Sequence, residues 1–180
     1  MNSLNNKVRL TCLVSFMILL DQGIKLYIHN RHMDKSFNIL FDFVRFEPKI
    51  NTKYSWINSL FDLGIGKAVH VIFAVLVLIS LLLVYCFIAK IYKVTKLIEF
   101  SFISIISGCI CSLIDKLFWN GSLDYIQFKN LFTFDLKDVY ISIFEVIVIA
   151  MLIFNYKNIR RLDDKKIRYE FRQYIGSFFK

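Results

Sequence analysis

Residues 68–88 read AVHVIFAVLVLISLLLVYCFI, a run of 21 residues without aspartate, glutamate, lysine or arginine. As an α-helix, such a run is about 30 Å long, which is the thickness of the hydrocarbon core of a bilayer. Three further apolar segments of about 18–21 residues occur at 8–28, 97–117 and 139–156. Four apolar segments of this length predict four membrane-spanning helices.

The composition of the whole chain is also that of an integral membrane protein. Its 180 residues are 57% hydrophobic and have a mean hydropathy of +0.54, whereas a soluble domain is about half apolar. One proline and six glycines exclude a disordered or collagen-like chain. A net charge of +9 would suit nucleic-acid binding, but much of it flanks the apolar segments. Orientation in a membrane explains that placement better, so no nucleic-acid partner is expected.

The distribution of lysine and arginine predicts the orientation of the chain. Thirteen of these residues lie in the N-terminal stretch, in the connection between the second and third segments, and in the tail after Tyr156. Eight lie in the longer connections 29–67 and 118–138. The positive-inside rule therefore places both termini in the cytoplasm and the two longer connections outside. The first segment is not expected to be a cleaved signal peptide, because it carries Asp21 and Lys25 in its second half.

The outer connection between the first two segments is expected to contain secondary structure. Phe37–Phe46 reads FNILFDFVRF, which has the aromatic and β-branched content of a strand that Pro48 interrupts. Tyr54–Leu63 reads YSWINSLFDL, a short amphipathic stretch that suits the membrane surface. The expected fold is an all-α integral membrane protein with four transmembrane helices and a small extracytoplasmic element of strand and amphipathic helix.

The C-terminal tail has a different character from the rest of the chain. Residues 1–156 are expected to form the membrane domain, and residues 157–180 a basic cytoplasmic tail. Apolar side chains recur in the tail at helical spacing: Ile167, Phe171, Tyr174 and Phe178. This pattern predicts an amphipathic helix on anionic lipid headgroups. A solvated, frayed tail is the alternative.

Ionisable side chains inside the spans are costly, so they usually face the interior of a bundle. Asp21 and Lys25 are four residues apart in the first span and are expected to pair on one helical face. The third span carries small and polar residues at three- and four-residue spacing: Ser104, Ser107, Gly108, Cys111, Ser112, Asp115 and Lys116. Such a stripe lets helices approach closely and turns Asp115 inward.

Three acidic residues are expected at the depth of the outer interface. Asp115 ends the third span, Asp124 lies in the outer connection, and Asp138 begins the fourth span. Two carboxyl groups held close together cannot both ionise at low cost, so one of them keeps a proton. Such a pair can activate water and protonate a substrate, which is the chemistry of an aspartic protease. The spacing alone leaves open helix capping with ion pairs to nearby lysines: Lys116, Lys129 or Lys137.

No other catalytic pattern is present in the sequence. The nucleophile elbow, the HExxH zinc motif, the phosphate-binding loop and the dinucleotide-binding glycine motif are all missing. His29, His32 and His70 lie near the ends of spans, where interfacial histidines are common. The sequence therefore predicts neither a metal site nor a cofactor.

Three motifs resemble those of signal peptidase II, the lipoprotein signal peptidase family. Asp21, Gln22 and Lys25 match its Asp-Gln-x-x-Lys motif late in the first helix. The stretch SLIDKLFWNGSLDYI, residues 112–126, corresponds to its Asn-x-x-Asp-Arg motif and the following Val-x-Asp-Phe-like element. FDLKD, residues 134–138, corresponds to its Phe-Asn-x-x-Asp motif. The order and spacing of the motifs agree over nearly the whole chain.

The resemblance implies an aspartic endopeptidase of the bacterial cell membrane. Its substrates would be prolipoproteins with a diacylglyceryl-cysteine, cut just before that residue, and its catalytic dyad would be Asp124 and Asp138. Roles in substrate binding or in the scaffold would fall to Asp21, Gln22, Lys25, Asn51, Ser112, Asp115, Lys116 and Asp135. No cofactor is implied.

Four positions depart from the family pattern. Ser112 replaces an asparagine, Lys116 an arginine, Asp135 an asparagine and Lys53 a glycine, although Asn51 is retained. Lysine cannot make the planar two-pronged contact of arginine, and an extra carboxylate raises the proton affinity of its neighbours. These departures leave open a relative that binds lipoprotein precursors or lipid without cutting them. An unrelated small transporter that uses the buried charges as an ion path is the third possibility.

Overall fold

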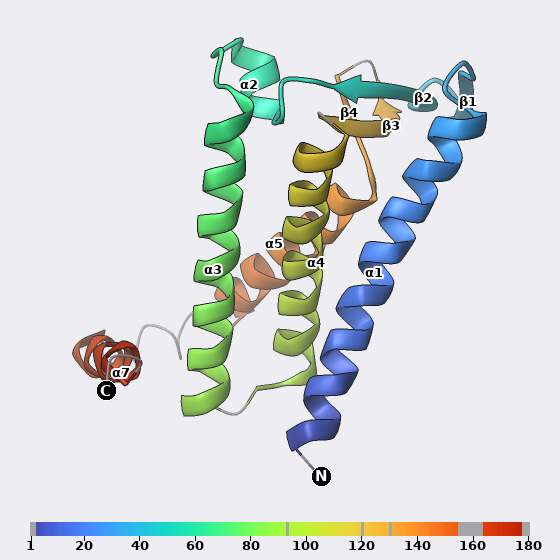
Figure 1. Cartoon of the computed structure of the whole chain (residues 1–180). Helices are drawn as coiled ribbons and strands as arrows, with labels where there is room; N and C mark the ends of the chain where they lie inside the picture. The colour runs from blue at the N-terminus through green and yellow to red at the C-terminus, as the bar shows by residue number, and fades with distance from the viewer. Residues whose placement is uncertain (1–2, 93, 120, 130, 155–163, 178–180) are drawn as a thin grey trace.

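The computed structural model describes residues 3–92, 94–119, 121–129, 131–154 and 164–177. Its helices are α1 (Ser3–Arg31), α2 (Trp56–Phe61), α3 (Lys67–Ile91), α4 (Lys96–Phe118), α5 (Leu136–Phe154) and α7 (Asp164–Gly176). Its strands are β1 (Phe37–Leu40), β2 (Val44–Asn51), β3 (Ser122–Phe128) and β4 (Phe132–Phe134). The long helices stand side by side, and the strands and α2 cover the end of the bundle away from the N-terminus (Figure 1).

Three of the described helices are long and apolar enough to cross a membrane: Lys7–Arg31 within α1, α3 and α4. They contain the first three predicted spans, and each extends beyond them by a few residues. α5 is only 19 residues long, and it carries three charged residues within that length: Lys137, Asp138 and Glu145. The protein therefore has the helices of a membrane protein, and the fourth span stays a prediction.

α4 is the central helix, because it packs against α1, α3 and α5. The small residues predicted to form a stripe are buried on it; Ser104, Ser107 and Cys111 have no exposed surface. A Cβ atom at Gly108 would lie 2.8 Å from Ile141 Cγ1 on α5 and 3.2 Å from the Lys137 carbonyl oxygen. The stripe thus brings α5 close to α4, as predicted.

The four strands form one antiparallel sheet in the order β1-β2-β3-β4. The single strand predicted at Phe37–Phe46 is in fact a hairpin, because residues 41–43 turn the chain and Phe41 adopts a φ of 46°. Pro48 does not end the strand but lies inside β2, where the register shifts between Phe46 and Lys49. A bulge tolerates the missing N–H of proline, which explains this placement.

The predicted small outer element with a strand and an amphipathic helix is present, as part of a four-stranded sheet whose strands β3 and β4 were not predicted. β3 is buried along most of its length, and a strand buried on both faces lacks the apolar–polar alternation that identifies strands in sequence. It pairs with β2 so that Asn51 lies opposite Ser122 and Lys49 opposite Asp124. This pairing brings the outer connections together over the end of α4.

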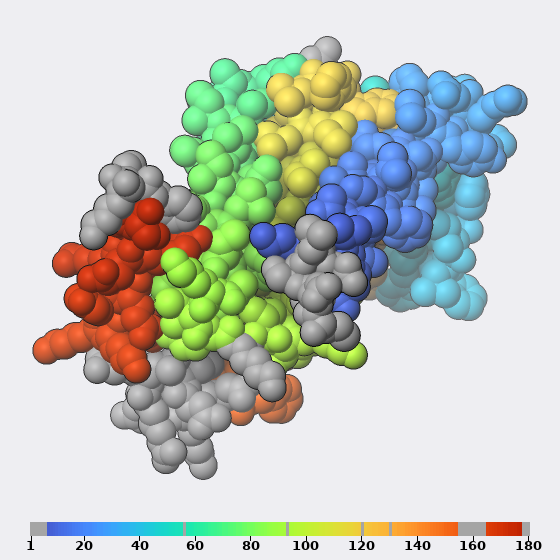
Figure 2. Space-filling model, turned by 60° about the horizontal axis from the view of Figure 1, so that its bottom comes forward, coloured from blue at the N-terminus to red at the C-terminus, as the bar shows by residue number. Residues whose placement is uncertain are grey.

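The two predicted amphipathic stretches are both helical. Ser55 caps α2 by accepting a hydrogen bond from the Asn58 backbone N–H, within the predicted stretch Tyr54–Leu63. α7 packs on the end of α3 through ring contacts of Phe87 with Phe171 and Tyr174 (Figure 2). The fourth residue of the predicted apolar stripe, Phe178, lies outside the described residues.

Candidate active site

Lys25 of α1 lies at the centre of a buried charge network. Its Nζ is 2.9 Å from Asp21 Oδ2, 2.6 Å from Asp115 Oδ2 and 2.7 Å from Asp135 Oδ2, and none of these side chains is exposed. An ammonium group has three N–H donors, so the three carboxylates use all of them. The predicted pairing of Asp21 with Lys25 is confirmed, and the same lysine also ties α1 to α4 and to the residue before α5.

Gln22 joins this network from the side. Its Nε2 donates to Asp21 Oδ2 at 2.9 Å and to Asp115 Oδ1 at 3.1 Å. Its Oε1 accepts a hydrogen bond of 3.0 Å from the Nε1 of Trp119, the residue that ends α4. Gln22 therefore holds the end of α4 in register with α1.

Asp135 and Asp138 cap the start of α5 reciprocally. The Asp138 N–H donates to Asp135 Oδ1 and the Asp135 N–H donates to Asp138 Oδ2, each at 3.2 Å. This arrangement is a capping box, which supplies partners to N–H groups that a helix start leaves unpaired. Capping, one of the alternatives left open by the spacing, is thus present, but it accounts for only part of what these two carboxylates contact.

β3 presents Asp124 to the same place. The Ser122 hydroxyl donates to Asp124 Oδ1 at 2.7 Å, and Asn51 Nδ2 on the neighbouring strand lies 3.5 Å from Asp124 Oδ2. Burial raises the pKa of the Asp124 carboxyl above its usual value, although the charge of Lys137 and the Ser122 hydrogen bond act against this. A carboxyl with a raised pKa is suited to holding a proton near neutral pH.

A second lysine, Lys137, occupies the middle of the acidic residues. Its Nζ donates to Ser122 Oγ at 2.6 Å and to Asp135 Oδ2 at 2.7 Å. Its backbone N–H donates to Asp21 Oδ1 at 3.1 Å. Longer contacts of 3.5, 3.6 and 3.7 Å join Nζ to Asp115 Oδ2, Asp124 Oδ1 and Asp138 Oδ1.

The carboxyl groups of Asp124, Asp135 and Asp138 converge, since one oxygen from each lies within 4.8 Å of the others. The Asp138 side chain is 40% exposed and that of Asp124 is 9% exposed, so water reaches this pair more easily than the buried network beneath it. Asp115, the third residue expected here, has no exposed surface and pairs with Lys25. The predicted convergence of acidic residues at one end of the bundle is confirmed, with Asp135 as an additional member.

Burial alone would raise the pKa of Asp135. The ammonium groups of Lys137 and Lys25 outweigh burial and hold the pKa of Asp135 below its usual value. Of the three lysines that the sequence offered as ion-pair partners, Lys137 is the one that pairs with Asp135, at 2.7 Å. Lys129 does not serve this role, because its Nζ lies 4.3 Å from the centre of the Phe43 ring.

Three carboxylates this close together are also a possible ligand set for a metal ion. Lys137 Nζ already lies within 3.7 Å of an oxygen of each of them. The charge of these carboxylates is thus balanced in part by the protein's own cation.

Two of the predicted site residues, Ser112 and Lys116, lie beside the cluster and do not enter it, and Lys53 and Glu145 lie away from it. Lys116 Nζ donates to Ser112 Oγ at 2.5 Å, and no ion pair of Lys116 is found among the described residues. Lys53 pairs with Asp62, at the end of α2. The exposed carboxylate of Glu145 lies outside the cluster as well.

Sequence comparison identifies the family. A family model described as Signal peptidase (SPase) II matches residues 13–154, which is most of the chain and includes all of the clustered residues. This chain belongs to the signal peptidase II family. The family comprises membrane proteases that process lipoprotein precursors, so this family member is a membrane hydrolase of that class. No curated protein sequence matches the chain.

Two solved structures share the fold of this signal peptidase II family member. Both are described as bacterial membrane enzymes determined by the in meso method, at 2.3 Å and 1.9 Å resolution. The first has a TM-score of 0.68 and 19% identity, covering 86% of this chain and 93% of its own. The second has a TM-score of 0.66 and 19% identity, covering 80% and 92%. At this identity the likeness concerns the fold alone.

Two residues at the centre of the site were not singled out from sequence. Ser122 stands in the second motif without a predicted role, and Lys137 is predicted only as one of three possible ion-pair partners of the acidic residues. The signal for Lys137 was available, because a lysine in the first turn of a helix opposes the helix dipole and needs a compensating acidic environment. The contact of its ammonium group with Ser122 of β3 depends on the tertiary structure.

Proposed function

We propose that this protein cleaves prolipoproteins just before the diacylglyceryl-cysteine, with Asp124 and Asp138 as the catalytic dyad. The observation that carries this proposal is the meeting of these two carboxyl groups, one from a strand and one from a helix start, at the rim of a buried charge network. Asp138 is partly exposed to water, whereas Asp124 is nearly buried. One carboxylate would activate water, and the other, protonated, would polarise the scissile carbonyl and protonate the leaving amine.

The roles of base and acid are not assigned to one aspartate each, because they are properties of the pair. Asp124 and Asp138 lie close enough to influence each other's ionisation, and two coupled carboxyl groups titrate as one unit. Asn51 would orient Asp124, while Asp21, Gln22, Lys25 and Asp115 would hold the helices that carry the dyad. These supporting roles follow from the hydrogen bonds and ion pairs described above.

Ser122 and Lys137 offer a different chemistry that we consider less suitable. A serine hydroxyl 2.6 Å from a lysine amine is the arrangement of a serine–lysine hydrolase, in which the neutral amine is the base. Here the surrounding carboxylates favour the charged ammonium, which has no lone pair to accept a proton. The Ser122 hydroxyl proton is also engaged by Asp124.

The proposal is tested by incubating the purified full-length protein, in phospholipid nanodiscs, with a prolipoprotein precursor in lipidated and unlipidated form. We expect a product shortened by the signal peptide from the lipidated precursor only, because the lipid holds the cleavage point at membrane depth. Mass spectrometry of the product gives the position of the cut. Cleavage of both forms at the same rate would contradict recognition of the lipidated cysteine.

A second candidate function is the binding of lipidated precursors without cleavage. The observation that favours it is the Lys137 ammonium group, which lies 3.6 Å from Asp124 and 3.7 Å from Asp138 and competes with water for both carboxylates. In the same nanodisc experiment, this function would give a photo-crosslink to the lipidated precursor and no shortened product.

For the topology, we propose four spans with α5 as the fourth and both termini in the cytoplasm. The start of α1 and α7 lie at the end of the bundle opposite the sheet (Figure 1), and Asp124 of the acidic cluster belongs to that sheet. This arrangement supports an outward-facing site, as the distribution of lysine and arginine predicts. Reporter fusions after Lys93 and after Lys180 should report the cytoplasm, and a fusion after Asn120 should report the outside. An external reporter after Lys180 would refute the fourth span.

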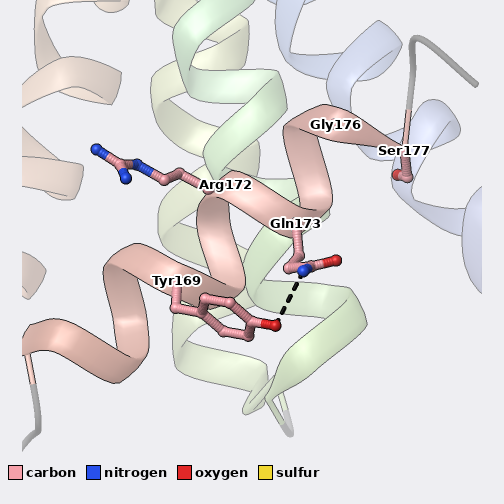
Figure 3. A pocket seen from close by; sticks show the side chains of 5 residues that line it. All are labelled: Tyr169, Arg172, Gln173, Gly176 and Ser177. Carbon is pink, nitrogen blue, oxygen red and sulfur yellow. Dashed lines mark hydrogen bonds between the residues drawn. The ribbon is translucent and has the colours of Figure 1, made fainter.

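For the tail, we propose that α7 lies on anionic lipid headgroups. Phe171 and Tyr174 contact Phe87 of α3, and Lys90 of α3 lies over the Tyr174 ring at 5.2 Å. A shallow pocket of about 420 Å³ on α7 is lined by Tyr169, Arg172, Gln173, Gly176 and Ser177 (Figure 3). Gln173 Nε2 donates to the Tyr169 hydroxyl there, whereas the Arg172 side chain points away from both (Figure 3). The basic residues of α7, Arg172 among them, suit anionic headgroups. Hydrogen exchange of α7 should slow when anionic lipid replaces neutral lipid in the nanodiscs, and an unchanged rate would refute the contact.

A further inference from the structure

Lys137 is equidistant from the two carboxylates of the proposed dyad. Its Nζ lies 3.6 Å from Asp124 Oδ1 and 3.7 Å from Asp138 Oδ1. Two of its three N–H donors are used by Ser122 and Asp135 at 2.6 and 2.7 Å. The ammonium charge of Lys137 therefore acts about equally on both dyad carboxylates and forms a close ion pair with neither of them.

The lysine is held firmly in this position. Only 6% of its surface is exposed, and its backbone N–H donates to Asp21 Oδ1 at 3.1 Å. Ser122 and Asp135 bind its ammonium group from β3 and from the residue before α5. Because both ends of the residue are bound, its charge has a fixed place relative to the dyad.

Asp135 is the electrostatic partner of this lysine. Its Oδ2 is 2.7 Å from Lys137 Nζ and 2.7 Å from Lys25 Nζ, and only 1% of its surface is exposed. A buried carboxylate without such partners would be strongly destabilising, and so would the buried lysine without the carboxylate. The two residues together add no net charge to the site, whereas either one alone would.

We propose that Lys137 is a positioning residue of the dyad and that it acts as an obligatory pair with Asp135. The lysine keeps one dyad carboxylate ionised and oriented, and Asp135 keeps the lysine in place. This inference rests on the proposed function for its effect on cleavage, while the pairing itself is independent of cleavage.

Charged side chains face Lys137 from every element packed around it. The charged groups facing it are Asp21 and Lys25 from α1, Asp115 and Lys116 from α4, Asp124 from β3, Asp135 before α5, and Asp138 on α5. The carboxylates outnumber the lysines, so full ionisation would leave a net negative charge in a buried space. Removing the charge of Lys137 therefore makes each remaining carboxylate harder to ionise.

The test is a double-mutant cycle with Lys137→Met, Asp135→Asn and the double variant, each assayed for cleavage of the lipidated precursor between pH 4 and 9. Lys137→Met should move the acidic limb of the rate profile upward by about one pH unit, because the base is protonated more readily without the nearby cation. Asp135→Asn should move it downward, because the lysine then acts without its counter-charge. The double variant should return close to the wild-type limb.

A second readout does not depend on cleavage. In thermal unfolding of the same nanodisc samples, each single variant should lower the Tm, and the double variant should recover most of the loss. Lys129→Met is the matched control, since that lysine contacts the Phe43 ring outside the cluster. It should change neither the Tm nor the acidic limb appreciably.

The two readouts separate the possible failures. Wild-type protein that cleaves no precursor refutes the proposed function, and the Tm cycle then decides the pairing alone. Additive Tm losses in the double variant refute the pairing. A third outcome is that the variants cleave the precursor and their Tm values are coupled, but the acidic limb of the rate profile does not move. Lys137 would then only support the fold, which overturns its role as a positioning residue.

Discussion

Asp124→Asn and Asp138→Asn are each expected to lower the rate of precursor cleavage by about 10³-fold or more while leaving the protein in the membrane. An asparagine amide has the shape of the carboxylate but neither accepts a proton from water nor donates one as an acid. Asp124 keeps a hydrogen-bond donor on each side, Ser122 at 2.7 Å and Asn51 at 3.5 Å, so the strand has no reason to unfold. The measurement is the initial rate with one lipidated precursor in nanodiscs.

Asp42→Asn is the matched control for these variants. Asp42 lies in the turn between β1 and β2, where it accepts a hydrogen bond from Asn38, so the change removes a carboxylate from the same sheet without touching the cluster. Its cleavage rate should stay within about twofold of wild type, because surface substitutions away from such features have small effects. Asp124→Asn protein that cleaves at the wild-type rate would refute the dyad, and Asp115 with Asp138 would become the pair to test.

Lys25→Met is expected to have the largest effect on stability of any single change. Lys25 has no exposed surface and contacts three carboxylates at 2.6–2.9 Å, so methionine would leave them buried without their cation. Removing one partner of a buried ion pair costs about 3–5 kcal/mol, and three orphaned carboxylates place the expected loss at the upper end of that range. We expect a large fall in Tm and little folded protein recovered from the membrane.

The double variant Lys25→Met/Asp115→Asn should regain part of that stability, because it removes one of the orphaned charges. Lys35→Met is the control, since Lys35 is exposed just beyond α1 and forms no side-chain ion pair among the described residues. A Lys25→Met protein with the Tm of wild type would show that the carboxylates take up protons at little cost, contrary to the network described here.

Much of the site followed from residue type and spacing. The pairing of Asp21 with Lys25 needs only a helix, because residues four apart lie on one face. The inward turn of Asp115 needs only that the small residues of its helix face a neighbour. The approach of Asp124 to Asp138 is different, because the residues are 14 apart and belong to a strand and a helix. From sequence, it rested on the family resemblance.

The fourth of the four predicted spans stays a prediction. α5 begins three residues before the predicted segment 139–156, so it includes Lys137 and Asp138 as well as Glu145, whereas residues 68–86 of α3 hold no aspartate, glutamate, lysine or arginine. Two of these three residues lie in the first turn of α5 and belong to the site. The charged residues that set α5 apart from α3 are thus largely those of the candidate active site.

By itself the sequence determined the helices and the kind of chemistry available. Uninterrupted apolar runs must become helices in a bilayer, because only a helix or a closed barrel satisfies every backbone N–H and C=O there. The tertiary structure alone decided that β3 is a strand and that Lys137 lies among the acidic residues. β3 lacks a local signal because it is buried along most of its length, and its partner β2 lies about 75 residues earlier in the chain. The place of Lys137 depends on β3, α4 and α5 meeting, since the surrounding carboxylates come from different elements and their charges act through space rather than along the chain.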